Sequence, residues 1–151
     1  EMCIRDSHYA GIMILPQPFV KQKGAYTVMM RKPIIFIKRD LHPAMRSIVL
    51  AHELGHHFLH RQEAMQSGGF HEFNLFDMQN NQMEYEANVF AAQLKLPDED
   101  VLECVYNGYD IAATAWALHS DINLVALKIA ELNRRGYQLR EQEYRNKFLR
   151  S

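Results

Sequence analysis

The sequence has few of the features that mark secreted or membrane-embedded proteins. Its 151 residues include only two cysteines, Cys3 and Cys104, which are too few for a disulfide framework and favour a reducing compartment. No apolar run approaches the roughly 18 residues that a membrane span requires. The first residues also lack the basic-then-apolar pattern of a signal peptide. Together these absences predict a cytoplasmic protein.

An overall excess of one charge is also missing, because the net charge is only −1. The charge is nevertheless unevenly distributed: the segment 62–132 contains 2 basic and 12 acidic residues, whereas the segments on either side of it are basic. An acidic middle segment would favour a basic partner. A solvated acidic face is the commoner explanation for such a pattern.

What the sequence does contain is the motif HExxH, at residues 52–56. On a helix, His52 and His56 come round to nearly the same face, where both imidazoles can bind one metal ion. Glu53 lies beside that face, within reach of a metal-bound water, which is the position of a general base. The motif therefore predicts a zinc-dependent hydrolase.

The surroundings of the motif predict that it lies on a helix. Pro43 suits a first helical turn, and apolar residues recur at helical intervals from there to about Arg61. Gly55 costs about 1 kcal/mol relative to alanine in the middle of a helix, which suggests that another backbone passes close to it. His57 and His60 are expected to be structural or exposed to solvent, although His60 is one turn beyond His56 and could contact the site.

A catalytic zinc site needs a third protein ligand and one open position. The metzincin pattern, with a further histidine soon after the motif, is not met. A second helix is predicted over residues 82–94, and its Glu84 is the predicted third ligand, with Glu86 as the alternative. Asn88, one turn after Glu84, could accept a hydrogen bond from the other ring N–H of a ligand histidine and so fix its tautomer.

Two segments of the chain resemble the ImmA/IrrE-type metallopeptidases. Residues 50–57, LAHELGHH, contain the motif, and residues 84–97, EYEANVFAAQLKLP, resemble the family signature ExxANxFAxxLLxP. Lys95 stands where an apolar residue is more usual. Weaker similarity extends from about Tyr9 to Leu139. The two segments together are specific, and they favour Glu84 over Glu86.

The resemblance implies both a site and a biological role. It implies Zn²⁺ bound by His52, His56 and Glu84, with Glu53 as the base. It further implies cytoplasmic proteolysis of a helix-turn-helix repressor of the XRE type, often encoded beside the peptidase in phages and mobile elements.

The expected fold class is α+β and zincin-like, with a small β-sheet packed on the HExxH helix and a following helical subdomain. A single domain is expected over residues 8–136. Residues 1–7 follow no periodic pattern and are expected to be non-native, and residues 137–151 are expected to form a charged C-terminal tail.

Three strands are predicted before the first helix, at residues 12–15, 26–30 and 34–37, separated by prolines and glycines. The third is our candidate for an edge strand that pairs with an extended substrate. Its run of isoleucine and phenylalanine fits an interior strand equally well. The segment 62–81, between the two ligand helices, is expected to be a loop that either covers the cleft or simply covers the core.

The chain after Pro97 is predicted to be helical. Asp98 is the expected cap of a helix over residues 101–106, and further helices are predicted at 111–119 and 122–132.

The last two predicted helices superficially resemble a helix-turn-helix. The residues 120–135 carry a net charge of only +1, which is too little for a basic recognition helix. Direct binding to nucleic acid is therefore not expected, and Trp116 and Leu118 are expected to lie in the core.

The predicted activity is that of a metallo-endopeptidase, in which Glu53 assists attack by a zinc-bound water on a peptide bond. Two alternatives remain open. The first is a regulatory protein-binding module with a structural or degenerate zinc site, for instance with His60 as a fourth ligand. The second is a DNA-binding regulator that acts through residues 111–132. One of the histidines His8, His42, His71 and His119, or a tyrosine such as Tyr26 or Tyr85, could stabilise the oxyanion.

Overall fold

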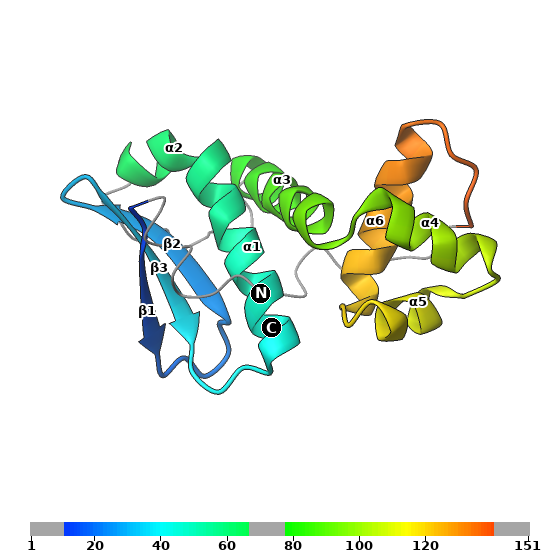
Figure 1. Cartoon of the computed structure of the whole chain (residues 1–151). Helices are drawn as coiled ribbons and strands as arrows, with labels where there is room; N and C mark the ends of the chain where they lie inside the picture. Colours follow the sequence, from blue (N-terminus) through cyan, green and yellow to red (C-terminus); the bar gives the residue numbers. More distant parts are fainter. Residues whose placement is uncertain (1–10, 67–77, 141–151) are drawn as a thin grey trace.

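The computed structural model describes residues 11–66 and 78–140 (Figure 1). These residues form a three-stranded sheet followed by six helices, which confirms the predicted α+β class and is compatible with a zincin-like fold. The strands are β1 (Met13–Gln17), β2 (Gly24–Met29) and β3 (Lys32–Lys38), and the helices are α1 (Pro43–Leu59), α2 (Arg61–Gln66), α3 (Met78–Lys95), α4 (Asp98–Tyr106), α5 (Ile111–Ala117) and α6 (Ile122–Arg134).

The sheet has the order β1-β3-β2, with β3 parallel to β1 and antiparallel to β2. The candidate edge strand at residues 34–37 is therefore wrong, and the interior alternative is confirmed. Ile35 and Ile37 of β3 are fully buried in the core that also contains Val49 of α1. An apolar strand with this burial is most stable between two partners, so β1 and β2 form the edges.

The first predicted helix, from Pro43 to about Arg61, is found as α1. Helix α1 begins with Pro43 in its first turn, as expected, but ends at Leu59, and His60 separates it from α2. Helix α3 lies against α1 and separates it from helices α4, α5 and α6 (Figure 1). A Cβ atom placed on Gly55 would lie 3.1 Å from the Cα of Ala87, which confirms that another backbone passes close to this glycine.

Helices α4, α5 and α6 form the predicted helical subdomain on the far side of α3 (Figure 1). Asp110 and Asp121 cap α5 and α6, since each carboxylate accepts a backbone N–H at 2.7 Å. Asp98 is not the cap that was predicted. Pro97 takes that position without a side-chain hydrogen bond, and the Asp98 carboxylate instead contacts α6.

Two more residues of this subdomain differ from expectation. Trp116 is 86% exposed rather than buried, because it lies on the outer face of α5, whereas Leu118 is partly buried and packs on the core as expected. Lys128 of α6 is fully buried, with its Nζ atom 2.5 Å from Asp98 Oδ1. This cation is therefore not available to a DNA phosphate.

The predicted loop 62–81 is partly helical, since α2 and the first turn of α3 extend into it, and residues 67–77 lie outside the described residues. In the parts of the chain that the structure describes, no helix is both long and apolar enough to span a bilayer. A common hydrophobic core connects the sheet to the last helix, from Ile12 to Leu132.

Candidate metal centre

Helix α1 presents the HExxH residues to a pocket that β2 borders. His52, Glu53 and His56 are only 4%, 5% and 7% exposed, although all three are polar. One potential ligand atom from each lies within 4.8 Å of those of the other two. The i, i+4 spacing of the two histidines has thus brought their rings together, as the sequence predicts.

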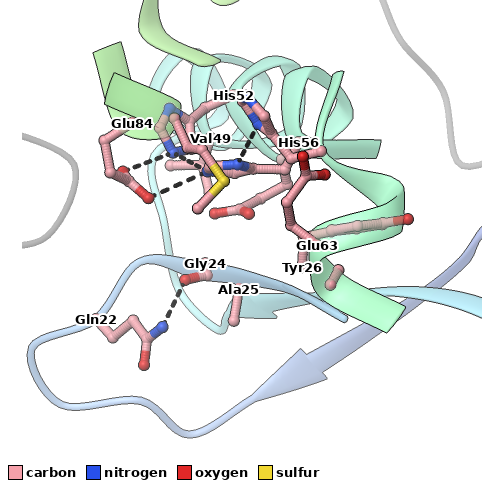
Figure 2. A pocket seen from close by; sticks show the side chains of 13 residues that line it. Gln22, Gly24, Ala25, Tyr26, Val49, His52, His56, Glu63 and Glu84 are labelled. Carbon is pink, nitrogen blue, oxygen red and sulfur yellow. Dashed lines mark hydrogen bonds and ion pairs between the residues drawn. The ribbon is translucent and has the colours of Figure 1, made fainter. Parts of the chain in front are cut away.

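Helix α3 brings Glu84 to the same point. Its carboxylate oxygens lie 3.3 Å from His52 Nε2 and 3.2 Å from His56 Nε2, and the two Nε2 atoms are 3.2 Å apart. Figure 2 shows Glu84 directed at the two imidazoles. The predicted third ligand therefore lies among the two histidines, whereas Glu86 does not face this cluster.

The Nδ1 atoms of His52 and His56 each have a hydrogen-bond partner of their own. His52 Nδ1 donates to Asn88 Oδ1 at 2.8 Å, the contact that the sequence predicted for Asn88. His56 Nδ1 lies 3.1 Å from His60 Nδ1, and His60 Nε2 donates to Glu86 Oε2 at 2.9 Å. The four-residue spacing from His56 to His60 indicated that His60 could contact the site, but no signal in the sequence predicted its contact with Glu86.

These hydrogen bonds test whether the cluster suits a metal ion. Because the Nδ1 atom of His52 carries the proton, its Nε2 atom presents a lone pair, and the same holds for His56 if its Nδ1 atom donates to His60. Two lone pairs and a carboxylate then converge, an arrangement that a cation would stabilise. Two imidazoles and one carboxylate are the donor set of a catalytic zinc site. The residues present therefore fit zinc.

The protonation preferences of His56 and Glu84 agree with this reading, whereas the raised pKa of His52 favours a proton that a bound metal would have to displace. Burial lowers the pKa of His56 to about 4. Burial acts in the same direction on His52, but the hydrogen bond to Glu84 and the negative charge of Glu53 outweigh it and raise its pKa. Burial also opposes ionisation of Glu84, yet its close contacts with the two imidazoles hold its pKa well below the usual range. Near neutral pH the cluster thus contains a carboxylate and a neutral His56.

Strand β2 passes directly over the predicted base. A Cβ atom placed on Gly24 would lie 2.8 Å from Glu53 Oε1 and 2.6 Å from Val49 Cγ1, so only glycine fits here without a shift. Gly24, Ala25 and Tyr26 line the pocket across from the histidines (Figure 2). The sheet edge that borders the pocket is therefore β2.

The two tyrosines considered for the oxyanion lie in different places. Tyr26 lines the pocket, and its hydroxyl lies 3.0 Å from His57 Nδ1. Burial raises the pKa of Tyr26, so its hydroxyl keeps its proton. Tyr85 instead donates to Glu131 and accepts from Arg134, on the side of α3 that faces α6. Of the two, Tyr26 borders the pocket.

Comparisons with known proteins agree with this geometry. The profile of peptidase family M78, described as the IrrE N-terminal-like domain, matches residues 8–129. The chain is also 35% identical over 91 residues to immunity region protein 2 of Bacillus phage phi105, a match that covers 60% of this chain and 55% of that protein. The chain thus spans little more than half the length of this curated relative.

Proposed function

The chain belongs to peptidase family M78, the family of IrrE N-terminal-like domains, and from this premise we propose that it is a zinc-dependent endopeptidase. The observation that carries the proposal is the convergence of His52 Nε2, His56 Nε2 and the Glu84 carboxylate within 3.3 Å of one another. In this proposal those three residues bind Zn²⁺, and Asn88 orients His52.

The catalytic role of the chain is to bind the metal and to move one proton. Bound zinc supplies Lewis-acid polarisation of the scissile carbonyl and lowers the pKa of a water molecule. Glu53 accepts the proton of the attacking water and passes it to the leaving amine, so no covalent intermediate with the protein is needed. Gly24 approaches Glu53 closely and so restricts the positions that the Glu53 carboxylate can take.

The peptide substrate is proposed to bind along β2. Strand β2 is one edge of the sheet and borders the pocket, so an extended peptide that pairs with it would pass the metal centre. The same role was predicted for residues 34–37, but that strand is central. Tyr26, on β2, is then the proposed hydrogen-bond donor to the oxyanion.

The proposed substrate is a helix-turn-helix repressor in the cytoplasm. The similarity to an immunity region protein of a phage supports this choice, as does the acidic segment 62–132, which suits a basic partner. The core that runs from Ile12 to Leu132 supports a single domain over residues 8–136. Residues 1–7 and most of the tail lie outside the described residues.

The proposal is tested by incubating the zinc-loaded protein with the repressor encoded nearest to its gene. Wild type should cleave it, whereas Glu53→Gln should retain zinc and lose about 10²- to 10⁴-fold in rate. The matched control is Glu63→Gln, which changes another glutamate that lines the pocket. Cleavage by Glu53→Gln at the wild-type rate would show that the proposed base is wrong.

A further inference from the structure

We propose that His60 and Glu86 are positioning residues that hold His56 in the tautomer and orientation needed to bind the metal. The inference rests on the proposed metal site and extends it to two residues with no assigned role. His60 ends α1 and is 6% exposed, and Glu86 lies on α3. Their contacts form one chain of hydrogen bonds from the protein surface to a proposed ligand.

The direction of each hydrogen bond follows from the carboxylate. Gln82 donates to Glu86 Oε1 and His60 Nε2 lies 2.9 Å from Glu86 Oε2, and a carboxylate can only accept. His60 must therefore carry its proton on Nε2, which leaves Nδ1 of the neutral ring as an acceptor. His56 must then donate from Nδ1, and its Nε2 lone pair faces Glu84 and His52.

The same geometry argues against His60 as a fourth metal ligand. Its Nδ1 atom is directed at His56 Nδ1, the nitrogen on the opposite side of the ring from the cluster, and its Nε2 atom is directed at Glu86. Both ring nitrogens are thus used in holding other side chains. The proposed metal site therefore keeps the open position that a hydrolytic centre needs.

Two series of hydrogen bonds begin at the Nδ1 atoms of His52 and His56, and helix α3 supplies the last acceptor of each. Asn88 accepts directly from His52, whereas Glu86 reaches His56 only through His60. Gln82 donates to the second oxygen of Glu86 at 2.9 Å and so restrains a side chain that is 43% exposed. Removing a residue that hydrogen-bonds to a metal ligand in this way typically weakens metal affinity about 10- to 100-fold.

The test is the zinc dissociation constant, measured by competition with a chromogenic chelator. His60→Leu removes the acceptor for His56 and should weaken zinc binding about 10- to 100-fold. His60→Asn places a carbonyl oxygen near the position of Nδ1, and this oxygen accepts without help from Glu86, so affinity should largely return. Circular dichroism and thermal melting of the zinc-free variants establish that each is folded.

A double-mutant cycle separates positioning from simple packing. Glu86→Ala should weaken zinc binding about 10-fold in the wild-type background but should have no further effect in the His60→Asn background. Glu103→Ala, an exposed glutamate on α4, is the control and should change nothing in either background.

The outcomes distinguish this inference from the proposed function. If wild type binds zinc while His60→Leu and Glu86→Ala bind it equally tightly, the positioning role is wrong and the metal site stands. If folded His60→Asn binds as weakly as His60→Leu, or if Glu86→Ala acts equally in both backgrounds, the hydrogen-bond account is overturned. Failure of wild type to bind zinc would overturn both proposals.

Discussion

Two polar clusters lie one on each side of α3, and they differ in how their carboxylates are neutralised. The first is the proposed metal centre, with Glu84 between His52 and His56. In the second, which we call the Lys128 cluster, the fully buried ammonium group contacts Asp98 Oδ1 at 2.5 Å and Gln93 Oε1 at 2.7 Å. Arg135 forms a bidentate pair with the same aspartate, at 2.7 and 2.9 Å, and this completes the second cluster.

The difference shows how a ligand site can be told from a structural network. The Lys128 cluster contains its own cations, so its charges are balanced within the protein. The proposed metal centre offers lone pairs and a carboxylate to one point, so a cation from solution would balance them. We therefore expect zinc to affect the first cluster and pH to affect the second.

The largest expected effect is the loss of zinc from Glu84→Ala, because this change removes a carboxylate that contacts both imidazoles. Wild type should contain one zinc per chain and should gain about 4 kcal/mol of stability when free zinc exceeds the dissociation constant 1000-fold. Mass spectrometry of the metal content and thermal unfolding measure the two effects.

Glu86→Ala is the matched control for that experiment. It should still contain zinc, since a weaker site remains filled when zinc is in excess. Zinc lost from Glu86→Ala but kept by Glu84→Ala would reverse the assignment of the third ligand.

Asp98→Asn should lower the free energy of unfolding by about 2 kcal/mol, because it leaves the buried Lys128 without its carboxylate. The value is below that of a fully buried pair, since the Asp98 side chain is 33% exposed. Urea unfolding of the zinc-free protein measures it. Asp100→Asn, on the exposed face of the same helix, should change stability far less. Equal losses in the two variants would show that the Lys128 cluster contributes nothing specific.

The contribution of Asp98 should also depend on pH. The hydrogen bonds from Arg135 and Lys128 hold the pKa of Asp98 below its usual range. Its folded state therefore binds a proton less readily than the unfolded chain, whose aspartates have a pKa of about 3.9. The stability difference between wild type and Asp98→Asn should be complete above that pH and should shrink as the pH falls below it. A difference that grows on acidification would contradict the sign.

The smallest expected effect is that of Gly55→Ala. A new methyl group would lie 3.1 Å from Ala87 Cα and 3.1 Å from Phe90 Cβ, so α1 and α3 must separate slightly. We expect a net loss of about 1 kcal/mol, since the cost of overpacking exceeds the gain in helix propensity. Zinc affinity should also fall, because α1 and α3 each supply ligands.

Gly108→Ala serves as the control for Gly55→Ala. Its φ of +86° makes alanine strained there, with open space around it, so it should reduce stability by about 1 kcal/mol without changing zinc affinity. An unchanged zinc affinity in Gly55→Ala would show that the spacing of α1 and α3 does not control the metal site.

Local patterns in the sequence predicted much of the fold. The three strands, the helix that carries His52 and His56, and the close approach at Gly55 all follow from residue spacing, which operates over a few neighbouring positions. Asn88 was placed on a ligand histidine because it lies one helical turn after Glu84. These predictions succeeded because the geometry of a helix or strand determines them.

The predictions that failed required knowledge of which elements are neighbours. Asp98 has the chemistry of a helix cap, but a buried lysine lies 30 residues further along the chain and pairs with it. Trp116 is large and apolar, yet the face of α5 on which it lies has no described element against it. In both cases the residue type favours the predicted role, but the tertiary surroundings give the residue a different one.

By itself the sequence determined the donor set and the helical face that presents it, because an i, i+4 pair of histidines must share one side of a helix. The tertiary structure decided which sheet edge borders the pocket, and it decided that His60 and Glu86 meet although they lie 26 residues apart. The physical reason is that both depend on packing between distant segments. Burial and shape control that packing, and no local spacing encodes it.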